Sequence, residues 1–167
     1  MHREGHVGAA LLAYAPLGFV VVAAGSETLA LVGGVAAAGL ATLPDYDLRV
    51  PGVEHRGPTH TVWFALAVGT LGALLGAAAG TSNGPLSALL LAAFGFATGT
   101  IAIVSHVAAD ALTPAGVRPF APLRADSYTY EVTRAANPVA NYVLLGIGVV
   151  AAALALAAGT WVAGVIG

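Results

Sequence analysis

Long apolar stretches separated by polar segments set the pattern of this chain. Five stretches contain no charged residue: 7–24, 29–43, 61–79, 86–104 and 139–166. A helix needs about 20 residues to cross roughly 30 Å of hydrocarbon. The third, fourth and fifth stretches meet that length, and the first is slightly short. The second is short and rich in glycine, so we expect it to pack closely or to span only in part.

The pattern predicts an all-α fold, a multi-pass bundle of about five transmembrane helices in one domain over residues 1–167. Lipid offers the backbone no hydrogen-bond partners, so spanning segments must be helical. Glycine and proline mark short turns at 25–28 and 81–85. The other two connections are longer and polar, at about 44–60 and 113–138.

The basic residues lie in only three segments: the N-terminal tail and the two long connections. The chain has no lysine, and its arginines are Arg3, Arg49, Arg56, Arg118, Arg124 and Arg134. With five spans these segments share one side, which the positive-inside rule makes cytoplasmic. An alternative is a cleaved signal peptide ending near residues 22–24. The length of the first stretch and the further spans that follow disfavour it.

Composition narrows the possible chemistry. The chain is 58% hydrophobic and 8% charged, against roughly 25% charged in a soluble domain. The absence of cysteine excludes disulfides and cysteine-based zinc sites. A net charge of -2 without a basic stripe argues against a nucleic-acid partner. No serine-nucleophile motif, phosphate-binding glycine loop or dinucleotide fingerprint is present.

A histidine and an aspartate end the fourth stretch. His106 and Asp110 are four residues apart and share one helix face. A carboxylate in a spanning helix costs on the order of 2.5–3.5 kcal/mol on insertion scales and needs a partner. Two readings stay open from this pair alone: a hydrogen bond that secures the helix end, and a metal site.

Two further segments carry potential metal ligands. Asp45 and Asp47 follow Pro44, and in an extended segment their carboxylates point the same way. Such a pair suits a divalent cation, although aspartates are also common in solvated turns. His55 and His60 end the same connection, and Thr59 is a candidate N-cap for the next helix.

Additional candidates come from the N-terminal tail and the arginines. His6 lies at the start of the first stretch, on the same predicted side. Arg56 and Arg118 are candidates for neutralising a phosphate, although an interfacial arginine also contacts lipid headgroups. The residues at 113–116 predict a tight turn beside the site, or a plain helix stop. The candidate metal ligands are thus His6, Asp45, Asp47, His55, His60, His106 and Asp110.

The succession of motifs resembles the YdjM-type family of inner-membrane, metal-dependent hydrolases, also described as LexA-binding. It comprises Gly5-His6, the segments 43–47 and 55–61, and His106-x-x-x-Asp110-x-x-Thr113-Pro114-x-Gly116 with Pro122 later. That family is grouped with zinc-dependent phospholipase C and P1-type nuclease, an all-helical fold with a zinc cluster. The resemblance implies that Asp45 bridges ions and that the other ligands are His6, His60, His106 and Asp110. The soluble relatives have more histidines, so fewer ions are expected here.

We therefore expect a membrane-bound hydrolase that holds one to three divalent ions, with zinc as first candidate. The substrate class is a phosphoester of a lipid or lipid-linked molecule. Asp47, Arg56 and Arg118 are the expected catalytic residues, with a free carboxylate as general base. One alternative is a non-enzymatic membrane scaffold that recruits a cytoplasmic partner through the second long connection. A metal or proton transporter is disfavoured, because the stretches offer few polar side chains at the bilayer midplane.

Overall fold

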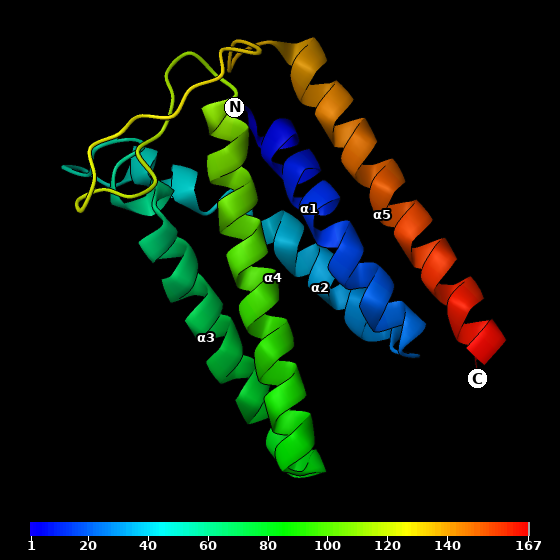
Figure 1. The fold of residues 1–167 in the computed structure, drawn as a ribbon. Coiled ribbons are helices and arrows are strands. Elements are labelled where there is room, and N and C mark those ends of the chain that lie inside the picture. The colour runs from blue at the N-terminus through cyan, green and yellow to red at the C-terminus, as the bar shows by residue number, and fades with distance from the viewer. Residues whose placement is uncertain (167) are drawn as a thin grey trace.

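The computed structural model describes residues 1–166, which form an all-helical chain (Figure 1). Its five α-helices are α1 (Arg3–Ala23), α2 (Glu27–Leu40), α3 (Val62–Gly80), α4 (Pro85–Ala111) and α5 (Pro138–Ile166). Three short 3-10 helices lie between them: η1 (Pro44–Arg49), η2 (Pro58–His60) and η3 (Thr81–Asn83). No strand occurs within residues 1–166, apart from one isolated bridge between Val117 and Tyr128. The predicted fold class is confirmed.

Within the described chain, α1, α3, α4 and α5 are each long and apolar enough to cross a membrane, and so is α2 together with η1. The second span reaches 23 residues only when η1 is included, because α2 itself has 14 residues. The expected short second element is therefore present. Helix α2 ends at Leu40, and η1 continues the chain at the polar end of the bundle.

The helices pack as two close pairs, α1 with α5 and α3 with α4, and α2 lies against α1 and α4. The contact of α3 with α4 depends on glycines at the crossing. A Cβ on Gly72 would collide with the backbone of Gly95, and one on Gly95 with the backbone of Gly72. Small residues at this crossing let the two backbones approach closely, which fixes the position of α4.

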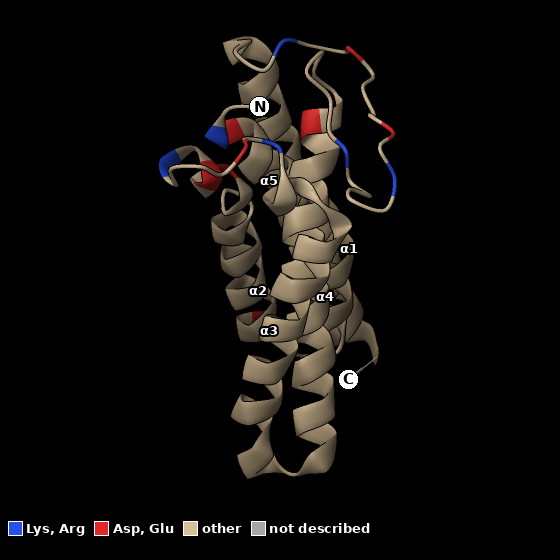
Figure 2. Cartoon of the chain, turned by 90° about the vertical axis from the view of Figure 1, so that its left-hand side faces the viewer, with Lys and Arg blue, Asp and Glu red and all other residues tan. Residues whose placement is uncertain are grey.

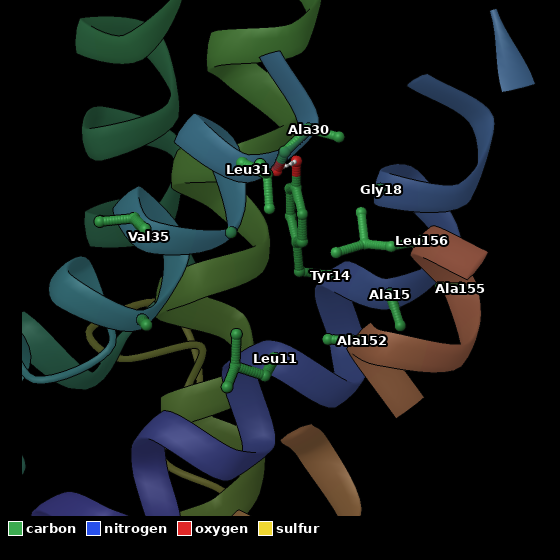
Figure 3. A pocket seen from close by; sticks show the side chains of 12 residues that line it. Leu11, Tyr14, Ala15, Gly18, Ala30, Leu31, Val35, Ala152, Ala155 and Leu156 are labelled. Atoms are coloured by element: carbon green, nitrogen blue, oxygen red, sulfur yellow. Dashed lines mark hydrogen bonds between the residues drawn. The ribbon is translucent and has the colours of Figure 1, made fainter. Parts of the chain in front are cut away.

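One hydrogen bond joins α1 to α2 inside the apolar region. The hydroxyl of Tyr14 donates to the carbonyl oxygen of Ala30 at 2.8 Å, as Figure 3 shows. The ring of Tyr14 stands beside an apolar pocket of about 320 Å³ between α1, α2 and α5. The bond satisfies a buried hydroxyl and holds α2 against α1.

Charged side chains gather at one end of the molecule (Figure 2). The N-terminus, η1, η2 and the connection from α4 to α5 all lie there, and so do all the arginines. Glu27, at the turn between α1 and α2, lies away from that end. The expectation that the three arginine-bearing segments share one side is confirmed. That this side is the cytoplasmic one remains a prediction.

Candidate metal centre

The last turn and a half of α4 carries the first two groups of the site. His106 and Asp110 are both fully buried, and His106 Nε2 lies 3.8 Å from Asp110 Oδ2. The other ring nitrogen of His106, Nδ1, donates to the carbonyl oxygen of Ala41 at the end of α2, at 2.6 Å. The predicted shared helix face is confirmed, and α2 orients the imidazole.

Three imidazoles and two carboxylates converge at this point. His6 comes from α1 and His60 from η2, both fully buried, and Asp45 comes from η1 with its side chain 26% exposed. The Nε2 atoms of His6, His60 and His106 lie 3.5–3.6 Å from an oxygen of Asp45. The same three atoms lie 3.5–3.8 Å from an oxygen of Asp110. All six nitrogen–oxygen distances therefore fall in one narrow range.

These distances are too long for hydrogen bonds, which have donor–acceptor separations of roughly 2.7–3.2 Å. Ligands bound at about 2.0–2.1 Å to one tetrahedral ion lie about 3.3 Å from each other. The spacing thus suits atoms arranged around a common cation. Asp110 Oδ2 and His6 Nδ1 are also buried without a hydrogen-bond partner, and an orphaned carboxylate oxygen at this position is an available ligand.

Asp45 and Asp47 point to different neighbours. The segment is not extended: η1 is a 3-10 helix over Pro44–Arg49. With about three residues per turn, positions two apart lie on different sides of the helix. Asp45 consequently faces His6, His60 and His106. The two carboxylates would point the same way only in an extended segment, and the 3-10 helix does not meet that condition.

Asp47 organises the loop that carries His55 and His60. Its side chain is buried, and its Oδ1 lies 2.9 Å from Nδ1 of His55. Its Oδ2 accepts from the Thr59 hydroxyl at 3.0 Å and from the Arg56 backbone N–H at 3.2 Å. The same oxygen lies 3.4 Å from Nδ1 of His60. Both oxygens of Asp47 are therefore engaged by residues 55–60.

Thr59 is a link in this network and does not cap α3. The cap of α3 is Thr61, whose hydroxyl accepts from the Phe64 N–H at 3.3 Å, so the expected cap at Thr59 is wrong. Since Thr59 gives its proton to Asp47, its oxygen is free to accept from Nδ1 of His60 at 3.0 Å. The network turns Nε2 of His60 toward the other ligands.

The hydrogen bonds set the tautomers of two histidines. A carbonyl oxygen only accepts, so Nδ1 of His106 carries its proton and Nε2 of the neutral ring has a free lone pair. The same reasoning holds for His60 beside Asp47. The two Nε2 atoms lie 3.0 Å apart, and two lone pairs this close repel unless a proton or metal ion lies between them.

The pKa of His60 shows that this position attracts positive charge. Burial lowers the pKa of His60, but its interactions with Asp110 and Asp45 outweigh burial and raise the pKa above the ordinary value of 6.5. A nearby carboxylate favours the charged form of an imidazole. The two carboxylates therefore favour a positive charge at this imidazole.

Two cationic groups hold Asp110 from the other side. The guanidinium of Arg56 lies 3.0 Å from Asp110 Oδ1, and the amino group of Met1 pairs with the same oxygen. Arg56 also donates to the Thr113 hydroxyl at 3.1 Å and to the Gly116 carbonyl at 2.9 Å. The tight turn predicted at 113–116 is present, because the Gly116 N–H donates to the Thr113 carbonyl with Gly116 at φ 62°.

Arg118 lies outside this cluster. Its guanidinium is 3.3 Å from the Glu54 carboxylate, in an exposed ion pair. Of the predicted metal ligands, all except Asp47 fall into two overlapping groups within residues 1–166. One is His6, Asp45, His106 and Asp110, and the other is Asp45, His55 and His60. Within each group the potential ligand atoms lie within 4.8 Å of one another, and Asp45 belongs to both.

Sequence reasoning missed three contributors. The carbonyl of Ala41 orients His106 but leaves no trace in the sequence. The role of Thr59 depends on tertiary contacts. Asn141 had a readable signal, because it is an amide inside the apolar stretch 139–166. It is buried and accepts from the His2 backbone N–H at 2.9 Å, which ties α5 to the segment before His6.

Comparison with known proteins adds one match. The family model described as YdjM inner membrane protein matches residues 1–167, the whole chain. No curated protein and no solved structure gives a significant match.

Proposed function

The chain belongs to the YdjM inner membrane protein family, and from this premise we propose that it is a membrane-bound, metal-dependent hydrolase. The substrate is a phosphoester of a lipid or lipid-linked molecule, cleaved at the cytoplasmic face. The observation that carries the proposal is the convergence of three imidazole nitrogens on two carboxylates at 3.5–3.8 Å. Imidazole with carboxylate is a donor set that suits zinc, and also manganese or iron.

The two ligand groups suggest positions for two ions. His6, His106 and Asp110 would hold one ion and His55 with His60 a second, with Asp45, which belongs to both groups, available to either. A divalent ion here would stabilise charge on phosphoryl oxygens and activate a water molecule.

Arg56 and Asp47 support this chemistry in different ways. The guanidinium of Arg56 is held by Thr113 and Gly116 beside Asp110, and its proposed role is to neutralise phosphate charge. Arginine is suited to phosphate because its planar fork binds two oxygens at once. Asp47 has both oxygens engaged, so it acts as a positioning residue for His55 and His60.

A lipid substrate fits the location of the cluster. Its ligands come from the polar ends of α1 and α4 and from the short helices η1 and η2. A lipid whose hydrocarbon chains remain in the bilayer has its phosphoester at this level, at the membrane surface.

A hydrolysis panel tests the proposal. Purified full-length protein is incubated with zinc or manganese and with phospholipids, lipid-linked phosphates and soluble phosphoesters, and released products are measured by mass spectrometry. We expect cleavage of a lipid phosphoester that chelation abolishes and added metal restores. His60→Ala should lose at least about a hundredfold in rate, as expected when an ion-holding group is removed. A metal-loaded, folded protein that cleaves no member of the panel would contradict the hydrolase proposal.

The second candidate is a non-enzymatic scaffold, favoured by the connection between α4 and α5. This segment exposes Leu123, Tyr130 and Val132, which are 69–75% accessible. Exposed apolar side chains in a polar loop are a common feature of protein-binding surfaces. A scaffold would bind its partner equally well with and without chelator, whereas the hydrolase requires metal.

A further inference from the structure

A second pocket lies beside the loop that carries His55 and His60. It has a volume of about 750 Å³ and is lined by residues of the 54–61 loop, the first turn of α3 and the segment 118–125. The aromatic residues Trp63 and Phe64 line one part of the pocket, and the guanidinium-bearing residues Arg118 and Arg124 line another. The metal cluster uses neither arginine. A pocket of a few hundred to 1,000 Å³ is large enough for a small-molecule group.

The pocket lies at the level where α3 enters the membrane. Trp63 is the second residue of α3, two positions after the Thr61 cap, and the residue is 44% exposed. Tryptophan is enriched where a membrane helix crosses the boundary between hydrocarbon and headgroups. The apolar wall of the pocket therefore continues into the lipid-facing surface of α3, while its arginines lie on the polar side.

The two arginines of the pocket can exchange their present carboxylate partners for a ligand. Arg118 pairs with Glu54 at 3.3 Å, and Arg124 with Asp126 at 2.8 Å. All four side chains are 49–75% exposed, and exposed ion pairs of this kind contribute little stability. Of the four, Asp126 does not line the pocket, so the lining has an excess of positive charge. An anionic group can replace either carboxylate at small cost.

We propose that this pocket binds the phosphate headgroup of an anionic phospholipid, with Arg118 and Arg124 on the phosphate and Trp63 against the glycerol backbone. The occupant is a resident lipid of the leaflet at the arginine-rich end, bound at the 54–61 loop. Basic pockets on membrane helices recognise anionic headgroups in this way. Binding requires no hydrolysis, so the proposal stands apart from the hydrolase proposal.

Fluorescence of Trp63 provides the test. The chain has two tryptophans, so Trp161→Phe leaves Trp63 as the only reporter. Phosphatidylglycerol and phosphatidylcholine are titrated separately into the full-length protein in detergent. We expect saturable binding of phosphatidylglycerol, about tenfold tighter than that of phosphatidylcholine, because two arginines lie near the anionic group. Mass spectrometry of the recovered lipid shows whether it is intact, so binding and cleavage are measured separately.

Three variants sharpen the test. Arg118→Gln combined with Arg124→Gln should weaken binding of phosphatidylglycerol about tenfold. Glu54→Gln removes the competing carboxylate and should strengthen binding. Arg134→Gln, an exposed arginine of the same connection outside the pocket, is the matched control and should leave binding unchanged. Inorganic phosphate should produce no saturable change, because it lacks the glycerol and acyl groups.

Two results would overturn the proposal. Equal affinity for the two lipids would show that the arginines do not recognise charge. A loss in Arg134→Gln as large as in the double variant would show a general electrostatic attraction to the surface rather than a built pocket.

Discussion

Two aspartates separated by one residue have different tasks at this site. Asp45 faces three imidazoles, whereas Asp47 faces the loop that holds His55 and His60. The cause is the 3-10 geometry of η1. Carboxylates that hydrogen-bond a ligand histidine fix its ring orientation and raise its basicity. Substitutions at the two positions should therefore produce different losses.

Replacing Asp47 tests the positioning role. Asp47→Asn retains the shape but replaces one acceptor oxygen with a donor, which conflicts with Nδ1–H of His60. We expect metal affinity to fall about 10- to 100-fold with metal stoichiometry retained at high concentration. Asp126→Asn, an exposed carboxylate, is the control. Chelator competition measures the affinities, and a loss of stoichiometry in Asp47→Asn would instead identify it as a direct ligand.

The raised pKa of His60 predicts how metal affinity depends on pH. Metal must displace the proton on His60, because only the free nitrogen binds an ion. Since this pKa lies above 6.5, affinity should fall, by up to about tenfold per pH unit for one proton, as the pH drops through it. His60→Gln should flatten this part of the profile. Competition titrations across a pH series, corrected for the chelator, measure it, and an unchanged slope in the variant would exclude His60.

At the scale of elements, the close approach of α3 and α4 determines where the ligands lie. Gly72 and Gly95 leave no space for a Cβ at the crossing. α4 carries His106 and Asp110, and the cap of α3 directly follows His60. A shift between the two helices would therefore separate ligands that contribute to one site.

Single methyl groups test this packing. Gly95→Ala should destabilise the protein by about 1–3 kcal/mol, the cost of overpacking. Gly146→Ala is the matched control, because a Cβ there meets nothing within 4 Å; it should be neutral or stabilising by up to about 1 kcal/mol. Thermal unfolding in detergent gives the comparison. Equal melting temperatures for the two variants would show that a methyl group at the crossing of α3 and α4 does not destabilise the protein.

The elements were largely predictable, whereas the site was predictable only in part. Apolar length identified every spanning helix, because lipid forces the backbone into helices. The spacing of four residues was enough to pair His106 with Asp110. The separate roles of Asp45 and Asp47 depend on a 3-10 helix that the hydrophobic periodicity of the sequence does not predict. The contact of Arg56 with Asp110 joins residues 54 positions apart, and only tertiary packing determines it.

At the scale of the whole molecule, charge is divided along the long axis. The arginines lie at the end that holds the cluster of histidines and aspartates (Figure 2), whereas Glu27 begins α2 at the turn after α1. The positive-inside rule gives this asymmetry a direction. We therefore predict that the cluster of histidines and aspartates faces the cytoplasm.

Labelling single cysteines tests that direction, and the chain has no native cysteine to interfere. Ser82→Cys lies in the turn between α3 and α4, and Ser127→Cys lies in the connection at the arginine-rich end; both positions are exposed. In intact cells a membrane-impermeant maleimide should label position 82 alone, and position 127 only after permeabilisation. The reverse pattern would place the cluster on the outer side.

Metal content tests the central claim most directly. Elemental analysis of the purified full-length protein should find at least one equivalent of a divalent transition metal, with zinc as first candidate. His106→Ala and Asp110→Ala should each lose that metal, whereas the exposed-site variant Asp126→Asn should keep it. Folded protein that neither contains nor takes up metal, or metal retained in both buried-site variants, would show that the converging imidazoles and carboxylates do not bind an ion.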